Sequence, residues 1–164
     1  MRNNLKAILL GAALWLPLAA QADDPYVKLG VGWTNYDYSG APSANETGVS
    51  LAYGAMYDKM WGLEVGYVDF GRDRANDFKA ESLYLAGTGT WPLNQQTALY
   101  GKLGVAVKRY KTTGASDTFT TGMAGVGAKW MFNKEWGASL EYAYYGKSAG
   151  ITIGQTTLAA IYNF

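Results

Sequence analysis

The sequence predicts an all-β fold, an eight-stranded antiparallel up-and-down transmembrane β-barrel, and three observations lead to this prediction. The chain ends on an alternating apolar stripe whose last residue is aromatic, Phe164. Segments of about ten residues with alternating polarity recur along the chain, which is typical of membrane-spanning strands. The N-terminus carries the pattern of an export signal. A barrel seals its sheet edge by pairing its first and last strands, so an apolar strand at the chain end fits the closing strand.

The first 22 residues have the three parts of a signal peptide. Arg2 and Lys6 precede an apolar stretch over residues 7–18, and Ala20-Gln21-Ala22 offers a small-x-small cleavage pattern. The apolar stretch is about a dozen residues, shorter than the roughly 20 that a spanning helix needs. We therefore predict a signal peptide at 1–22 and a barrel domain at 23–164.

Composition excludes several classes of function. The chain has 14 basic and 13 acidic residues, so it has no basic field for nucleic acid. It contains neither cysteine nor histidine, which removes disulfides, thiolate metal sites and the common Ser-His-Asp and Cys-His nucleophile systems. We expect no enzyme activity, no cofactor and no metal site. The 21 glycines, 13 tyrosines and 6 tryptophans fit a close-packed barrel with aromatic girdles.

Seven alternating segments precede the closing stripe. The connections between them alternate between tight turns, which we assign to the periplasmic side, and longer polar loops, which we assign to the external side. The strands are expected at 26–36, 47–57, 61–70, 80–91, 99–109, 121–132, 136–145 and 158–164. The turns are expected at 58–60, 92–96 and 133–135, and the loops at 39–46, 71–77, 111–118 and 146–154.

The charged residues within the strands decide which face points to the lumen. A lysine that faces lipid near the bilayer midplane costs about 2–4 kcal/mol, whereas one that faces the lumen avoids this cost. A slip of one residue would turn every such charge into lipid. The predicted lumen charges are Lys28, Glu64, Lys102, Lys129 and Glu141. They either satisfy one another structurally or form a network that rearranges to pass water or small ions.

A secreted soluble β-sandwich or lipocalin-like barrel would invert these faces. The apolar set would then be interior and the small polar set exposed. Such a fold has no use for tryptophan and tyrosine at both ends of the outward faces, and it would expose many glycines. The membrane barrel is therefore the favoured interpretation.

Two further sets of residues are candidate contact sites. Basic residues gather near the external rim, where they either contact lipopolysaccharide phosphates or extend to the interface as solvated charges. These residues are Arg72, Arg74, Lys79, Arg109 and Lys111. The outward set of the closing strand is Leu158, Ala160, Tyr162 and Phe164, which we assign as a C-terminal assembly signal for the barrel-assembly machinery.

Several stretches resemble the eight-stranded transmembrane domain of OmpA-like outer-membrane proteins. They are Tyr26-Val27-Lys28-Leu29-Gly30-Val31-Gly32-Trp33, Gly62-Leu63-Glu64-Val65-Gly66-Tyr67 with Gly71-Arg72, Trp91-Pro92-Leu93, Lys102-Leu103-Gly104 and Leu140-Glu141-Tyr142. The resemblance implies a monomeric, surface-exposed barrel in the outer membrane of a Gram-negative bacterium, with a polar interior and at most a narrow, gated passage. Larger members of this family continue into a peptidoglycan-binding domain, and we expect none after Phe164.

The chain also departs from the family pattern in the lumen. The resemblance implies that Glu64 matches a gate glutamate that pairs with an arginine on the seventh strand, but Ser139 stands at that position here. A family lysine becomes Thr88, and a family glutamate becomes Lys129. We therefore expect Glu64 to pair with Lys102 or Lys129.

The expected function is that of an integral outer-membrane barrel that contributes to envelope integrity and passes small solutes at most narrowly. The alternative is an adhesin or receptor-like barrel that recognises a partner through its four external loops. A true pore is a third hypothesis. Glu64 and Glu141 could in principle serve as paired glycosidase carboxylates, but a filled lumen offers no substrate cleft between them.

Overall fold

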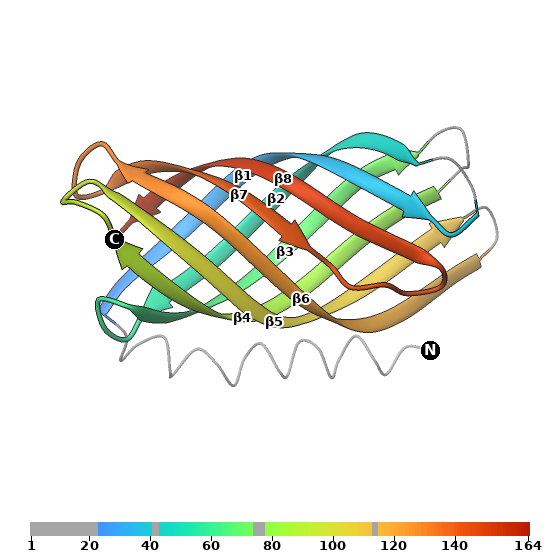
Figure 1. Ribbon diagram of the computed structural model, residues 1–164, viewed down its shortest axis with the longest axis horizontal. Coiled ribbons are helices and arrows are strands. Elements are labelled where there is room, and N and C mark those ends of the chain that lie inside the picture. The colour runs from blue at the N-terminus through green and yellow to red at the C-terminus, as the bar shows by residue number, and fades with distance from the viewer. Residues whose placement is uncertain (1–22, 41–42, 74–77, 113–114) are drawn as a thin grey trace.

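The chain forms a closed barrel of antiparallel strands in which each strand pairs with its neighbours in sequence and β1 also pairs with β8 (Figure 1). This confirms the predicted fold class. The computed structural model describes residues 23–40, 43–73, 78–112 and 115–164. The predicted signal peptide at 1–22 lies outside them. The strands are β1 (Asp23–Tyr38), β2 (Ala44–Met56), β3 (Trp61–Asp73), β4 (Phe78–Pro92), β5 (Thr97–Thr112), β6 (Ala115–Met131), β7 (Trp136–Tyr144) and β8 (Ile151–Asn163).

The β2–β3, β4–β5 and β6–β7 turns lie at the same end of the barrel as the C-terminus (Figure 1). We call this end periplasmic and the opposite end external. Each of these turns uses one side-chain carbonyl or carboxylate oxygen to bind two backbone N–H groups. Asp58, Asn94 and Asn133 accept hydrogen bonds from the amides two and three residues later, at 2.6–2.9 Å. Asp and Asn favour tight turns for this reason.

The strands extend further at the external end than the sequence predicts. Four predicted loops contain strand residues: β2 begins at Ala44, β3 ends at Asp73, β6 begins at Ala115, and β8 begins at Ile151 rather than at Leu158. The apolar alternation ends where the side chains leave the lipid, but backbone pairing does not depend on side-chain polarity. The polarity pattern of the sequence therefore shows where the lipid-facing apolar belt ends, but it does not show where the strands end.

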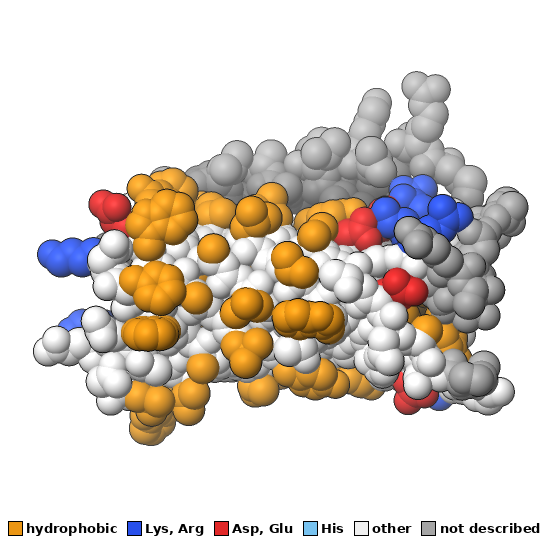
Figure 2. All heavy atoms as spheres, turned by 90° about the horizontal axis from the view of Figure 1, so that it is seen from above, with side chains coloured by type: hydrophobic (Ala, Val, Ile, Leu, Met, Phe, Trp, Pro, Cys, Tyr) orange, Lys and Arg blue, Asp and Glu red, His pale blue; other side chains and the backbone are white. Residues whose placement is uncertain are grey.

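The outward face carries exposed apolar side chains over the middle of the barrel, and charged side chains gather toward its two ends (Figure 2). Leu29, Leu103 and Val126 are each more than 60 % exposed, as expected where lipid covers the surface. In the described residues no helix is long and apolar enough to cross a membrane.

The lumen is filled by two layers of different chemistry. The layer nearer the periplasmic end contains ionised side chains and tyrosine hydroxyls. The layer nearer the external end is apolar and aromatic, and its buried members include Tyr36, Phe70, Phe78, Tyr110 and Tyr145. The candidate functional site lies in these two layers of the lumen.

Candidate functional site: a charge network and an aromatic plug in the lumen

The four charges at the centre of the lumen alternate in sign around the odd-numbered strands. Lys28 lies on β1, Glu64 on β3, Lys102 on β5 and Glu141 on β7. Each belongs to the inward set of its strand because side chains of a strand alternate between faces. Each charge has a small residue as a register partner on a neighbouring even-numbered strand, which leaves room for the long side chains to meet across the lumen. These partners are Ala52, Ala86, Gly125 and Gly127.

Glu64 is the centre of the network and its side chain is fully buried. Its Oε2 accepts hydrogen bonds from Lys28 Nζ at 2.7 Å and Tyr26 Oη at 2.9 Å. Its Oε1 accepts from Tyr84 Oη at 2.7 Å and Lys102 Nζ at 3.0 Å. Four donors thus satisfy a charge that would be costly to bury alone.

Lys102 joins Glu64 to Glu141. Its Nζ lies 2.6 Å from Glu141 Oε1, and Tyr100 donates a hydrogen bond to Glu141 Oε2 at 2.9 Å. The result is a chain of two ammonium groups and two carboxylates, Lys28–Glu64–Lys102–Glu141, with no net charge. We call these four residues the lumen network.

Three tyrosines that support the network each lie opposite a glycine on the neighbouring strand. Tyr26 pairs in register with Gly54, Tyr84 with Gly66, and Tyr100 with Gly127. A Cβ added to any of these glycines would overlap the ring opposite. The inward glycines therefore make room for rings whose hydroxyl groups hold the carboxylates.

The same rings also contact the ammonium groups. Lys28 Nζ lies 4.5 Å from the ring centroid of Tyr100 and 5.1 Å from that of Tyr26, and Lys102 Nζ lies 4.6 Å from that of Tyr84. Cation–π contacts of this length add to the stabilisation of desolvated cations. Each lysine of the network is therefore held by carboxylate and ring together.

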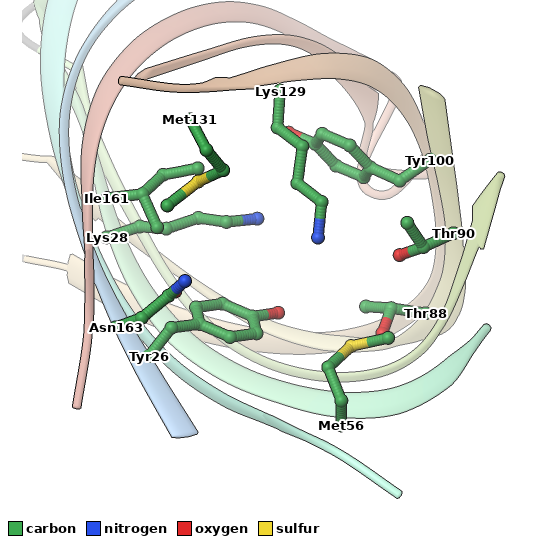
Figure 3. Close-up of a pocket in the computed structure, with 10 residues that line it drawn as sticks. All are labelled: Tyr26, Lys28, Met56, Thr88, Thr90, Tyr100, Lys129, Met131, Ile161 and Asn163. Atoms are coloured by element: carbon green, nitrogen blue, oxygen red, sulfur yellow. The ribbon is translucent and has the colours of Figure 1, made fainter. Parts of the chain in front are cut away.

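The structure brings four of the five predicted lumen charges together but leaves Lys129 outside the network. Lys129 has no ion pair with any residue that the structure describes, and it points into the periplasmic mouth of the barrel beside Lys28 (Figure 3). The expectation that Glu64 pairs with Lys102 or Lys129 is met by Lys102. Lys102 is level with Gly125 in the β5–β6 register, four residues from Lys129, or about 13 Å along the strand. Lys28 is the second ammonium group that forms an ion pair with Glu64.

Sequence reasoning missed the aromatic plug. We use this name for the buried rings of Tyr36, Phe70, Phe78, Tyr110 and Tyr145. Phe70 contacts Tyr145 edge-on with a centroid distance of 4.8 Å, and Phe78 lies 5.6 Å from Tyr36 and 5.1 Å from Tyr110. The signal was present, because each ring has the inward parity of its strand. Tyr36, Phe70 and Tyr145 are the last residues of their predicted segments, and Phe78 and Tyr110 lie just outside theirs.

Lys108 was also missed. Its side chain is fully buried beside the plug, and its amine donates to the backbone carbonyls of Tyr145 at 2.7 Å and Gly146 at 2.6 Å. No carboxylate pairs with it among the described residues. Lys108 therefore ties the start of the β7–β8 connection to β5.

The remaining spaces in the lumen are small. One cavity of about 20 Å³ lies against the network, between its charges and Tyr145 and Gln155. A second of about 20 Å³ lies at the periplasmic mouth (Figure 3). Each has room for about one water-sized occupant.

The external rim carries the predicted basic residues on the outward face of β3, β4 and β5. Arg72, Lys79 and Lys111 are neighbours in register across these strands. Lys79 Nζ lies 2.8 Å from Asp69 and 3.4 Å from Glu81, and Lys111 Nζ lies 2.7 Å from Glu81.

Arg109 lies on β5 two residues before Lys111 and pairs in register with Glu81. Its Nε donates a hydrogen bond to Ser116 Oγ at 3.1 Å. Arg74 lies outside the described residues. Lys79 and Lys111 thus share the carboxylates of Asp69 and Glu81.

The predicted C-terminal set lies on the outward face of β8. Leu158 is 52 % and Phe164 70 % exposed, and the ring of Tyr162 lies 4.8 Å from that of Trp136 and 5.1 Å from that of Phe164. Phe164 N also donates to the carbonyl of Pro25, so the last residue is tied to β1.

The network and its neighbours contain no metal centre in the described part of the chain, where no group of three or more Asp and Glu residues converges. Both lumen carboxylates bind the same ammonium group, that of Lys102. The arrangement is suited to holding the lumen shut.

Comparison of the sequence with known protein families identifies the family of this chain. A model of the outer membrane protein beta-barrel domain matches residues 7–164. The chain belongs to the outer-membrane β-barrel family. Outer membrane protein A of Yersinia pseudotuberculosis serotype I (strain IP32953) is 26 % identical over 163 residues, which cover 85 % of this chain and 46 % of that relative. The chain therefore spans about half the length of that protein.

Two solved structures share the fold. The Neisserial surface protein A has a TM-score of 0.70 at 16 % identity, with 85 % of this chain and 97 % of that chain covered. Ail, the attachment invasion locus protein of Yersinia pestis, has a TM-score of 0.61 at 20 % identity, with 87 % and 99 % covered. The family and the fold together place this OmpA-like barrel in the bacterial outer membrane.

Proposed function

We propose that this protein is a non-enzymatic outer-membrane barrel that contributes to envelope integrity and conducts little or no small solute. The observation that carries the proposal is the filled lumen. The network crosses the lumen on four strands, the aromatic plug lies external to it, and the cavities near the network are about 20 Å³ each.

Passage of a hydrated ion would require the network to open and the plug to move. Opening the network separates buried charges, which costs several kcal/mol unless other partners replace the lost ones. Moving the plug separates rings with centroid distances of 4.8–5.6 Å. Both costs favour a barrel whose lumen stays closed and which contributes to the envelope as a rigid structural protein.

Complementation tests this proposal. A strain that lacks the gene should become more sensitive to bile salts and to large antibiotics, and the wild-type gene should restore resistance. Variants in which residues 39–43 or 113–114, between the strand ends, are replaced by glycine-serine segments of equal length should restore it as well. Failure of the deletion to alter resistance would count against an envelope role.

The alternative is surface recognition through the external loops. Ail is described as an attachment invasion locus protein, and the shared fold makes a similar role a second candidate here. Recognition is favoured if the same two loop replacements abolish binding of a cell or matrix partner while resistance is unchanged.

We also propose that the external rim binds lipopolysaccharide phosphates and helps to anchor a monomeric barrel in the outer leaflet. Lys79 and Lys111 are part-exposed at the outward edge of the apolar belt, where ammonium groups suit a phosphate. The exposed C-terminal set, Leu158 to Phe164, is proposed as the contact with the assembly machinery.

The rim is tested by the thermal unfolding temperature in vesicles with and without lipopolysaccharide. Wild type should gain stability from lipopolysaccharide, and K79Q/K111Q should lose most of that gain. K134Q, at the periplasmic turn, is the matched control. An equal gain in K79Q/K111Q would rule out the phosphate contact.

A further inference from the structure

The periplasmic mouth of the lumen contains a cavity that the network does not use. It is lined by residues of several strands, among them Lys28, Thr88, Thr90 and Lys129. Figure 3 shows the side chains of Lys28 and Lys129 entering it from different sides, with both amines pointing toward its middle. Tyr26 and Tyr100 line its inner wall and turn their hydroxyl groups to the carboxylates of the network.

The side chains that line this cavity include two ammonium groups and no carboxylate. The carboxylate of Asp24 attracts Lys129, but Asp24 is exposed and does not line the cavity. In the network, Lys28 and Lys102 pair with the carboxylates of Glu64 and Glu141. Both carboxylates are already occupied by the network and its tyrosines. Lys129 lies close enough to Lys28 for their charges to repel. Within this cavity Lys129 therefore has no ion-pair partner among the described residues.

The cavity also offers neutral donors. The hydroxyl of Thr90 points into the opening (Figure 3). Thr88 lines the same cavity, is 4 % exposed, and its Oγ1 has no hydrogen-bond partner in the described structure. The volume of about 20 Å³ suits one occupant of about the size of a water molecule.

We propose that a small monovalent anion, of the size of chloride, binds in this mouth between the amines of Lys28 and Lys129. The anion supplies a counter-charge inside the cavity and accepts hydrogen bonds from ammonium and hydroxyl donors, and charged donors form strong hydrogen bonds with anions. The site is a dead end, because the network and then the aromatic plug lie beyond it. It is therefore a bound-ion site that completes the lumen, and it does not require conductance.

Backbone amide NMR of the refolded protein in detergent micelles tests the site. Sodium chloride replaces sodium gluconate at constant ionic strength, since gluconate is too large for the cavity. Wild type should show saturable shifts at Thr88, Thr90 and Lys129. K129Q should weaken chloride binding by about tenfold or more, as expected for the loss of a charged donor, whereas K129R and the turn variant K134Q should bind like wild type.

Equal shifts with gluconate, or wild-type binding by K129Q, would overturn the proposal. If K129Q does not fold, T90V replaces it and should weaken binding without loss of charge. Crystals of the wild-type protein soaked in bromide provide a direct check. An anomalous peak within hydrogen-bonding distance of Lys129 Nζ supports the site, and its absence at saturating bromide contradicts it.

Discussion

Lys102 of β5 and Glu64 of β3 form an ion pair across the lumen at 3.0 Å, with β4 between their strands. The pair is buried on both sides, because the side chains are 2 % and 0 % exposed. Lys102 also binds Glu141, so one ammonium group joins carboxylates from two strands. A single side chain therefore links three of the barrel strands through its interior.

Replacement of Lys102 by methionine should destabilise the barrel strongly. It leaves Glu64 with one ammonium partner, Lys28, and the hydroxyls of Tyr26 and Tyr84. Among the described residues, Glu141 keeps only the hydrogen bond from Tyr100. Removal of one member of a buried ion pair costs about 3–5 kcal/mol. Guanidinium unfolding in lipid vesicles, followed by tryptophan fluorescence, measures the change. K134M, at an exposed turn, is the control, and equal midpoints for K102M and wild type would show that the pair contributes nothing net.

The tyrosine–glycine pairs predict a contrast between two glycines of adjacent strands. In G66A the new Cβ would lie 2.5 Å from Tyr84 Cζ, so the ring must shift and its hydrogen bond to Glu64 is disturbed. In G87A the nearest atom to the new Cβ is 3.9 Å away. We expect G66A to lose about 1–3 kcal/mol of stability, typical of overpacking, and G87A to lose much less. Equal losses would mean that ring placement on glycine is unimportant.

Lys108 should act locally. K108M removes the donor that binds the carbonyls of Tyr145 and Gly146, but it also removes the cost of burying an unpaired charge. We therefore expect faster amide hydrogen exchange over residues 145–150 with little change in the unfolding midpoint. K147M, on an exposed neighbour, serves as the reference. Unchanged exchange in K108M would show that the lysine does not hold this connection.

The turn oxygen of Asn133 should matter by an amount typical of a local hydrogen-bonded turn. N133A leaves the amides of Glu135 and Trp136 without their acceptor, whereas N133D keeps an oxygen in place. We expect N133A to lose about 1 kcal/mol of stability and N133D to stay close to wild type. The same vesicle unfolding experiment separates them, and identical losses in the two variants would contradict the hydrogen-bond explanation.

Strand number, strand order and side-chain face were predictable because they follow from alternation, which the sequence displays directly. Glu64 and Glu141 point inward as expected since the opposite register would place each in lipid. The position of each inward side chain along the barrel axis was not predictable from alternation. Lys28 and Lys129 share the inward face, but which lysine reaches Glu64 depends on strand stagger, which parity does not reveal.

The aromatic plug was missed for a related reason. Phe78 lies outside the segment predicted for its strand. Tyr36 is the last residue of its predicted segment, although β1 continues to Tyr38. Strands that continue past the lipid boundary keep their inward parity, so their rings meet above the network. Continuing the alternation by one or two residues beyond the predicted segments would have added Phe78 and Tyr110 to the inward rings already at the segment ends.

Planar-bilayer recording tests the central claim, a lumen closed by the network and the plug, most directly. Purified wild-type protein, shown to be folded by its heat-modifiable gel mobility, should produce no discrete conductance steps in potassium chloride. A variant that opens both layers, K102M with F70A and Y145A, should produce them if it folds. Regular steps from the wild-type protein, with amplitudes that change in E64Q, would contradict the closed lumen.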